Sequence, residues 1–80
     1  MRCPVGEVGW VLNNSLRFRD GQTRTYTANT TITLPSGQQI TAGGYGHCIA
    51  CDELDISALA YQRQCASCGG TWTGSSCTPP

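Results

Sequence analysis

The spacing of the cysteines constrains this chain more than any other feature. The chain has 80 residues and six cysteines, and five of the six fall in one C-terminal segment, residues 48–77, with the sequence CIACDELDISALAYQRQCASCGGTWTGSSC. A domain this small builds only a marginal hydrophobic core, so cross-links or a bound metal commonly supply the missing stability. We therefore expect the following residues to form disulfides or to bind a metal: Cys3, Cys48, Cys51, Cys65, Cys68 and Cys77.

The same segment carries the strongest helix signal in the chain. Asp52 is a good N-cap, and Asp55 follows at the spacing of a capping box. No glycine or proline interrupts residues 53–68, and two glycines follow where a left-handed C-cap would end a helix. Spacings of four and three place these residues on one helical face: Leu54, Ala58, Tyr61, Cys65 and Cys68. We expect one continuous helix over about residues 53–68, whose apolar face, widened by Ile56, Leu59 and Ala60, packs against a sheet.

The N-terminal half is typical of antiparallel β-hairpins, over about residues 7–42. Val8, Trp10 and Leu12 occupy alternate positions, as in a half-buried strand. A turn signal follows at Asn13-Asn14. We therefore predict a small α+β fold in which the hairpins pack on the C-terminal helix and the cysteines staple the two together. Residues 1–80 are long enough for one domain only.

The dipeptide Asp20-Gly21 predicts a hairpin turn. A two-residue turn would place two arginines opposite each other, and like charges directly opposite destabilise an antiparallel pair. A three-residue loop over residues 20–22 instead sets Leu16 opposite Tyr26. We prefer this second register.

The clearest turn in the chain is Pro35-Ser36-Gly37. Proline fits the first corner of a type I turn, and Gly37 is able to adopt the left-handed conformation that follows. This loop pairs Ile32 with Ile40, so we expect both isoleucines on one buried face.

Two C-x-x-C pairs, Cys48/Cys51 and Cys65/Cys68, are a pattern typical of a zinc ribbon. A helix over residues 53–68 opposes that interpretation. It would hold Cys51 and Cys65 about 20 Å apart, at ~1.5 Å of rise per residue, whereas one zinc ion needs every sulfur at about 2.3 Å. The helix and a four-cysteine site are therefore close to mutually exclusive.

A disulfide framework is the competing interpretation, because six cysteines can form three bridges. Cys65 and Cys68 on one helical face can reach two different partners, and Cys77 can fold back on the end of the helix after a short strand and turn. A dithiol redox site is the third interpretation, since Cys48 and Cys51 precede a helix N-terminus. The sequence leaves the disulfide pairing open.

Charge is sparse and balanced in this chain. All five basic residues are arginines, and the formal net charge is zero. A basic surface for nucleic acid is therefore absent from the composition, and abundant Thr, Gly and Ser are typical of an extracellular or virion surface. No run approaches the ~20 apolar residues of a membrane span. Arg2 is followed by Cys-Pro-Val-Gly rather than by the apolar run of a secretion signal. We therefore expect neither a membrane span nor a secretion signal.

No residue set matches a catalytic signature. His47 is the only histidine and lies in a glycine-rich loop. The acidic cluster Asp52, Glu53 and Asp55 is explained by helix capping, so we expect no enzymatic activity. Among the aromatic residues, Tyr45 and Trp72 are our candidates for partner contact.

The C-terminal segment CASCGGTWTGSSCTPP, residues 65–80, resembles the cysteine-bounded tails of the form Cys…GGTW-x-G-x-x-C found in some phage tail-fibre and tail-tip proteins and in shufflon-type minor pilin tips. The resemblance implies a rigid, stapled module used in attachment or virion assembly. The chain lacks the long apolar N-terminal helix of the pilins, which favours the phage proteins. The resemblance also implies that the protein is located in the virion or outside the cell, after a first stage in the cytoplasm.

We therefore expect a non-enzymatic structural or attachment module, a component of a bacteriophage tail whose partners are other protein subunits. We expect no membrane partner, no nucleic-acid partner and no cofactor, with zinc left open. Two alternatives stand beside it. One is a small zinc- or iron-binding module that contacts protein or nucleic acid, and the other is a dithiol redox protein.

Overall fold

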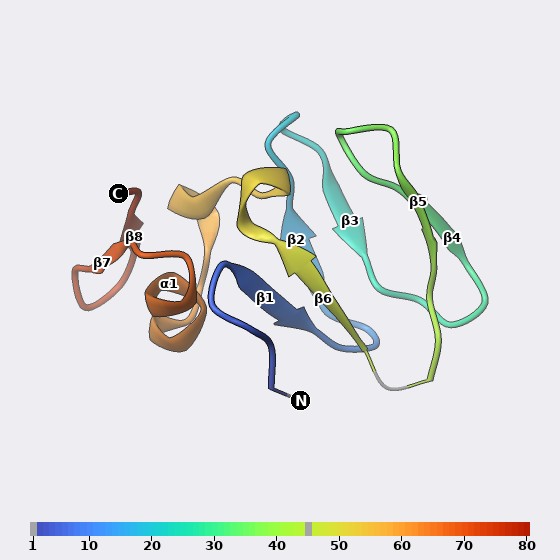
Figure 1. The fold of residues 1–80 in the computed structure, drawn as a ribbon, viewed down its shortest axis with the longest axis horizontal. Coiled ribbons are helices and arrows are strands. Elements are labelled where there is room, and N and C mark those ends of the chain that lie inside the picture. Colours follow the sequence, from blue (N-terminus) through green and yellow to red (C-terminus); the bar gives the residue numbers. More distant parts are fainter. Residues whose placement is uncertain (1, 45) are drawn as a thin grey trace.

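Short strands and turns, rather than long elements, make up the fold. The computed structural model describes residues 2–44 and 46–80. In chain order the elements are β1 (Glu7–Trp10), β2 (Ser15–Arg17), β3 (Thr23–Thr25), β4 (Thr31–Thr33), β5 (Gln39–Thr41), β6 (His47–Ala50), the 3₁₀ turns η1 (Cys51–Glu53) and η2 (Ile56–Ala58), α1 (Gln62–Ser67), β7 (Thr71–Trp72) and β8 (Cys77–Thr78). Figure 1 shows the β4–β5 hairpin at one end of the molecule and α1, β7 and β8 at the other.

The strands form two-stranded antiparallel sheets, and the expected small α+β fold, stapled by cysteines, is confirmed. The β1 strand pairs with β6, far along the chain, with Val8 opposite Ile49 and Trp10 opposite His47. The predicted hairpin region, residues 7–42, therefore ended too early. The segment between β1 and β6 folds as two hairpins, β2–β3 and β4–β5, that project from this central pair (Figure 1).

The predicted register of the first hairpin is wrong by two residues. Leu16 lies opposite Arg24 rather than Tyr26, and Arg17 lies opposite Thr23, so the like-charge pair is still avoided. The Asp20 carboxylate explains the shift, because it accepts hydrogen bonds from the Gln22 amide (2.9 Å) and from the Arg24 guanidinium (2.7 Å). A shift of two residues keeps every side chain on its face, so the buried side stays apolar.

The second hairpin is confirmed in register, with Ile32 buried as expected and Ile40 only partly buried. Ile32 lies opposite Ile40, the Leu34 amide donates to the Gln38 carbonyl (2.8 Å), and Ile32 is buried. Gly37 has a φ of 94°, the left-handed conformation that the turn requires.

Three aromatic side chains form the centre of the core. Trp10, Phe18 and Tyr26 are completely buried, and the Trp10 ring meets the other two edge-on, at centroid distances of 5.7 and 5.2 Å. Each polar atom of these rings has a partner. Trp10 Nε1 donates to the Asn14 carbonyl (2.8 Å), and the Tyr26 hydroxyl accepts from the Gly43 amide (2.8 Å). The core therefore lies between β1 and the two hairpins.

The continuous helix predicted over residues 53–68 is wrong. The segment contains two 3₁₀ turns and the six-residue helix α1, separated by extended residues. Backbone pairing with residues 17–19, at the end of β2 and just beyond it, explains the difference. The Arg19 amide donates to the Glu53 carbonyl (2.9 Å), and the Asp55 amide donates to the Arg17 carbonyl (3.0 Å). Leu54 between them is extended and forms a β-bridge with Phe18. Local helix propensity is a weak prior, and tertiary pairing overrides it here.

The helix prediction also placed several side chains incorrectly. Ala58 and Tyr61 are exposed, whereas Leu59, at the margin of the predicted face, is buried as expected. Asp52 caps no helix, since Ala50 holds the N-cap position of η1 without a side-chain hydrogen bond. Asp55 does act as a cap, but for the 3₁₀ turn η2, where it accepts from the Ser57 amide at 3.2 Å.

Candidate functional site

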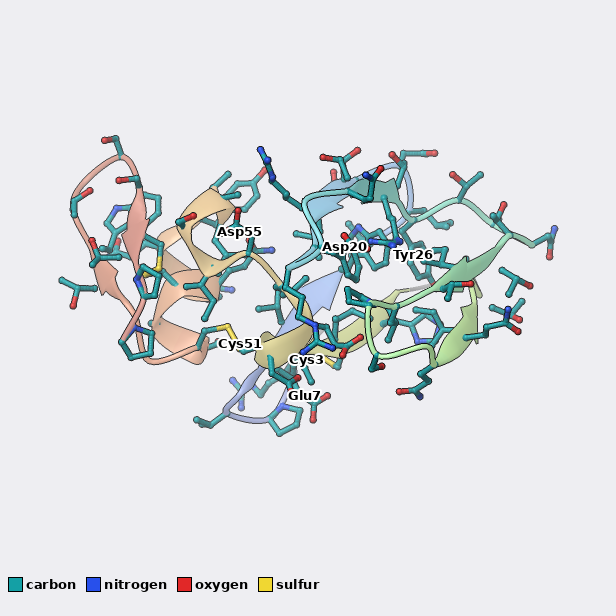
Figure 2. All side chains as sticks on the ribbon, turned by 90° about the horizontal axis from the view of Figure 1, so that it is seen from above. Cys3, Glu7, Asp20, Tyr26, Cys51 and Asp55 are labelled. Atoms are coloured by element: carbon teal, nitrogen blue, oxygen red, sulfur yellow. A yellow bond between two sulfur atoms is a disulfide. The ribbon has the colours of Figure 1, made fainter. Side chains whose placement is uncertain are left out.

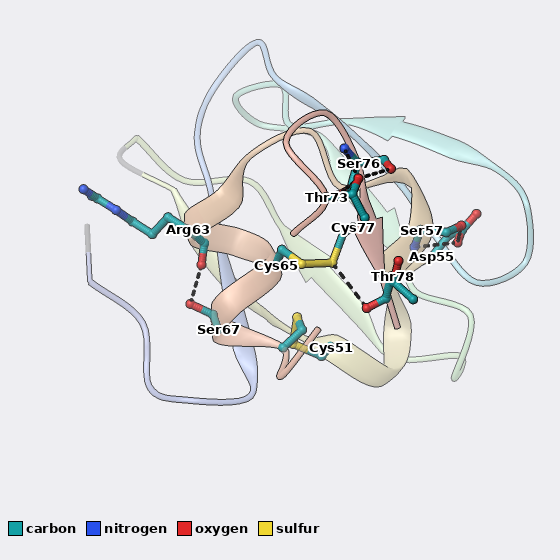
Figure 3. The surroundings of a disulfide bond; sticks show 11 residues. Cys51, Asp55, Ser57, Arg63, Cys65, Ser67, Thr73, Ser76, Cys77 and Thr78 are labelled. Carbon is teal, nitrogen blue, oxygen red and sulfur yellow. Dashed lines mark hydrogen bonds between the residues drawn. A yellow bond between two sulfur atoms is a disulfide. The ribbon is translucent and has the colours of Figure 1, made fainter. Parts of the chain in front are cut away.

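All six cysteines are paired in three disulfides: Cys3–Cys48, Cys51–Cys68 and Cys65–Cys77. The first ties the N-terminal segment to β6. The other two hold α1 from two directions, so Cys65 and Cys68 reach different partners, as the disulfide interpretation predicted. Figure 3 shows the Cys65–Cys77 bridge between α1 and β8, and Figure 2 places Cys3 and Cys51 near the middle of the molecule.

This pairing bears on the zinc and dithiol interpretations. A zinc ribbon needs both C-x-x-C pairs as thiolates around one ion, but here Cys51 and Cys65 belong to different bridges. Within residues 2–44 and 46–80, no group of three or more His, Cys, Asp or Glu side chains is placed to hold a metal ion. Disulfides persist in oxidising environments, so the pairing indicates an extracellular type of setting.

In the described part of the chain, no helix combines the length and the apolar character needed to cross a membrane.

Two of the ionisable side chains considered as catalytic candidates, His47 and Glu53, are engaged in structural interactions. His47 Nε2 lies 3.0 Å from the Thr41 carbonyl, and its ring lies 5.4 Å from the Tyr26 ring, tilted by 59°. Glu53 is buried, accepts a hydrogen bond from the Ser36 hydroxyl (3.1 Å) and lies 3.8 Å from Arg19. These groups therefore connect elements of the fold, and the structure does not bring them together at one point.

The two predicted partner-contact residues have different outcomes. Tyr45 lies outside the described residues. Trp72, in β7, is half-buried and packs against the core beside the C-terminal disulfide-linked elements. Its exposed portion is therefore limited, and it lies in the C-terminal hairpin β7–β8.

The arginines divide into two sets. Three are paired with carboxylates: Arg17 with Asp55 (3.7 Å), Arg19 with Glu53 (3.8 Å) and Arg24 with Asp20 (2.7 Å). Arg24, which donates hydrogen bonds to Asp20, lowers the pKa of that carboxyl below its ordinary value. The other two, Arg2 and Arg63, have no carboxylate within 4.0 Å in the part of the chain that the structure describes.

Both unpaired arginines line the same depression. It lies between β1 and α1, has a volume of about 700 Å³, and is open to solvent. We call it the β1–α1 groove and define it by these lining residues: Arg2, Glu7, Val11, Tyr61, Arg63 and Gln64. Figure 3 shows the Arg63 side chain extending from α1 away from the Cys65–Cys77 bridge.

The groove also gathers exposed apolar surface. Val11 is 43% exposed and Tyr61 is 61% exposed, and in the described residues only one other large hydrophobic side chain, Val5, is exposed. Unpaired cations and exposed apolar groups in one depression are a combination that suits binding of another molecule.

Sequence reasoning missed every residue that gives the groove this character. The helical spacing predicts Tyr61 on the buried face of a helix that does not form, and the strand pattern of Val8, Trp10 and Leu12 assigns no role to Val11. Arg2 and Arg63 carry no local motif. The only signal available was the small number of carboxylates near them in sequence, which leaves both arginines without an obvious partner.

No protein-family model, no curated protein and no solved structure matches this chain.

Proposed function

We propose that this protein is a non-enzymatic structural or attachment module that works within a larger assembly of protein subunits, and that the assembly is a bacteriophage tail. The observation that carries the proposal is the β1–α1 groove, an open, partly apolar depression that holds both unpaired arginines.

The disulfides support the binding role because of where they lie. Cys3 lines the groove and is bonded to Cys48 in β6, while Cys65 and Cys68 fix α1, which forms the opposite wall. Both walls are thus cross-linked to the rest of the molecule. A rigid surface loses little conformational entropy when a partner binds, which favours affinity.

The bacteriophage setting is supported by the resemblance of residues 65–80 to phage tail-fibre and tail-tip segments. Three disulfides fit a protein that works outside the cell. A virion protein reaches that environment when the host lyses, so its bridges would form late.

The proposal is tested by looking for the protein in purified virions or surface appendages by mass spectrometry, after washing at high salt. We expect a fixed ratio to other subunits, and in the assembly structure a buried interface above about 1,000 Å² that covers Val11, Tyr61 and Arg63. Recovery only as a free monomer, with a thiol-dependent or metal-dependent activity lost on mutating Cys48 or Cys51, would contradict it.

A further inference from the structure

One edge of β1 carries hydrogen-bonding groups that the fold does not use. The Cys51 amide donates to the Gly6 carbonyl (2.9 Å), which extends the β1–β6 register by one pair. Hydrogen-bonded pairs alternate along an antiparallel ladder, so Val8 and Trp10 bond to β6. The backbone groups of Glu7 and Gly9 therefore point away from β6, toward the β1–α1 groove.

Two of the four groups on that edge already have partners. The Glu7 amide donates to the Pro4 carbonyl (3.1 Å), and the Gly9 carbonyl accepts from Gln64 Nε2 at 3.4 Å. The Glu7 carbonyl and the Gly9 amide have no partner within the described residues. One unsatisfied acceptor and one unsatisfied donor thus flank Val8 on the groove side.

The spacing of this pair fixes how another strand can use it. In a parallel pair, one residue donates its amide to the carbonyl before its neighbour and accepts from the amide after it. An incoming residue beside Val8 would bond to Glu7 and Gly9 in that way. An antiparallel strand would instead need both backbone groups of Glu7 or both of Gly9, but the Glu7 amide is already bonded to Pro4 and the Gly9 carbonyl to Gln64.

The charges of the groove select the chemistry of the strand. Arg2 and Arg63 have no ion-pair partner in residues 2–44 and 46–80, and Glu7 is the one acidic residue that lines the groove. The apolar groups there, Val11 and Tyr61, suit aliphatic side chains. Complementary charge and apolar contact both favour a peptide that mixes acidic and aliphatic residues.

We propose that the β1–α1 groove binds an extended acidic segment of a partner protein, which adds to the edge of β1 as a parallel strand. One of its residues bonds to the Glu7 carbonyl and the Gly9 amide, and its carboxylates lie against Arg2 and Arg63. This inference deepens the proposed function and rests on it.

The test uses the full oxidised chain and a fluorescein-labelled, end-capped peptide of alternating valine and glutamate. Fluorescence anisotropy is expected to show binding that weakens as salt is raised, and no binding of the matching valine–lysine peptide. Arg63→Gln should weaken binding about threefold and Arg2→Gln/Arg63→Gln about tenfold, at up to 1 kcal/mol for each exposed charge pair. Arg17→Gln, which removes a paired arginine outside the groove, is the matched control and should leave binding within about twofold.

Backbone addition is tested by N-methylation of the peptide at either its valine or its glutamate amides, which blocks one edge of the strand at a time. One series should abolish binding and the other should retain it. Full binding by both series would overturn the strand-addition geometry. An oligothymidylate that bound more tightly than the peptide, with the same dependence on Arg2 and Arg63, would overturn the choice of a peptide.

The outcomes separate this inference from the proposed function. If the protein occurs in virions at a fixed ratio but binds neither peptide, the inference is wrong and the proposed function stands. If the acidic peptide binds but the protein occurs only as a free monomer, the groove is assigned correctly and the assembly role is wrong.

Discussion

Gly70 shows how tightly the residues around one disulfide are packed. A Cβ atom at this position would lie 2.6 Å from Cys77 Sγ, 2.8 Å from the Thr78 carbonyl oxygen and 3.0 Å from Cys65 Sγ. Backbone and disulfide atoms cannot rotate away, so the position accepts only glycine. The Cys65–Cys77 bridge and the β7–β8 hairpin can therefore pack this closely only because Gly70 has no side chain.

Gly70→Ala is therefore expected to lower the free energy of unfolding by about 1–3 kcal/mol, the usual cost of overpacking. Thermal denaturation followed by circular dichroism measures this. Gly44→Ala is the matched control, because a Cβ there meets nothing within 4 Å. Equal melting temperatures for the two variants would contradict the packing around Gly70.

Asp20 gives the protein a defined response to acid. The Arg24 guanidinium, which bonds to the Asp20 carboxylate, lowers the carboxyl pKa in the folded protein. A depressed pKa contributes stability above the ordinary pKa of aspartate, and that contribution is lost as pH falls below about 4.

Asp20→Asn retains an acceptor for the Gln22 amide but removes the charge. The stability difference between wild type and variant should therefore be largest at neutral pH and should shrink as the pH is lowered. Urea denaturation at a series of pH values measures this, with Asp52→Asn, at an exposed position, as the control. A difference that grows in acid would contradict the assigned ion pair.

Among the elements, the β4–β5 hairpin is the one that its own residues specify most completely. Proline and glycine set the turn, and the alternation of Ile32 and Leu34 sets the buried face, so the register was predictable. The absence of a helix over residues 53–61 was not predictable, because residues 53–55 pair with residues 17–19, far away in the sequence. The backbone hydrogen bonds of Glu53 and Asp55 to Arg19 and Arg17 cannot be inferred from the local sequence pattern.

Gly37→Val tests the hairpin. Gly37 has a φ of 94° and no atom within 4 Å of its Cβ position, so the cost of a side chain there comes from the backbone alone. A β-branched residue resists this conformation, and we expect a loss of about 1 kcal/mol or more in the free energy of unfolding. Gly44→Val, at a position without a positive φ, should be less destabilising. Chemical denaturation compares the two, and an unchanged midpoint for Gly37→Val would contradict the turn.

At the scale of the whole molecule, the three disulfides connect parts of the chain that are far apart in sequence. The molecule measures 35 × 25 × 20 Å, and its C-terminal elements lie at one end (Figure 1). The binding groove arises from this arrangement, since it needs β1, α1 and the N-terminal segment together. Sequence alone could give the cysteine chemistry as a set of options, but not the groove, because its residues meet only after β1 pairs with β6.

The bridges should differ in their contribution to stability. They close loops with sequence separations of 45, 17 and 12 residues. Loop-closure entropy gives roughly 4 kcal/mol for the longest and about 3 kcal/mol for each of the others. Replacing both cysteines of a pair by serine should therefore destabilise most for Cys3/Cys48. Calorimetry of the three double variants measures the order, and a smallest loss for Cys3/Cys48 would contradict this reasoning.

The rigid frame and the groove both require the cysteines to be bonded to one another. Mass spectrometry of the native protein, alkylated before and after reduction and digested without reduction, tests this directly, together with elemental analysis for zinc and iron. We predict that no cysteine is alkylated before reduction, and that the linked peptides join Cys3 to Cys48, Cys51 to Cys68 and Cys65 to Cys77. Thiols that react without reduction, accompanied by one equivalent of zinc or iron, would contradict the cross-linked frame and the groove that it supports.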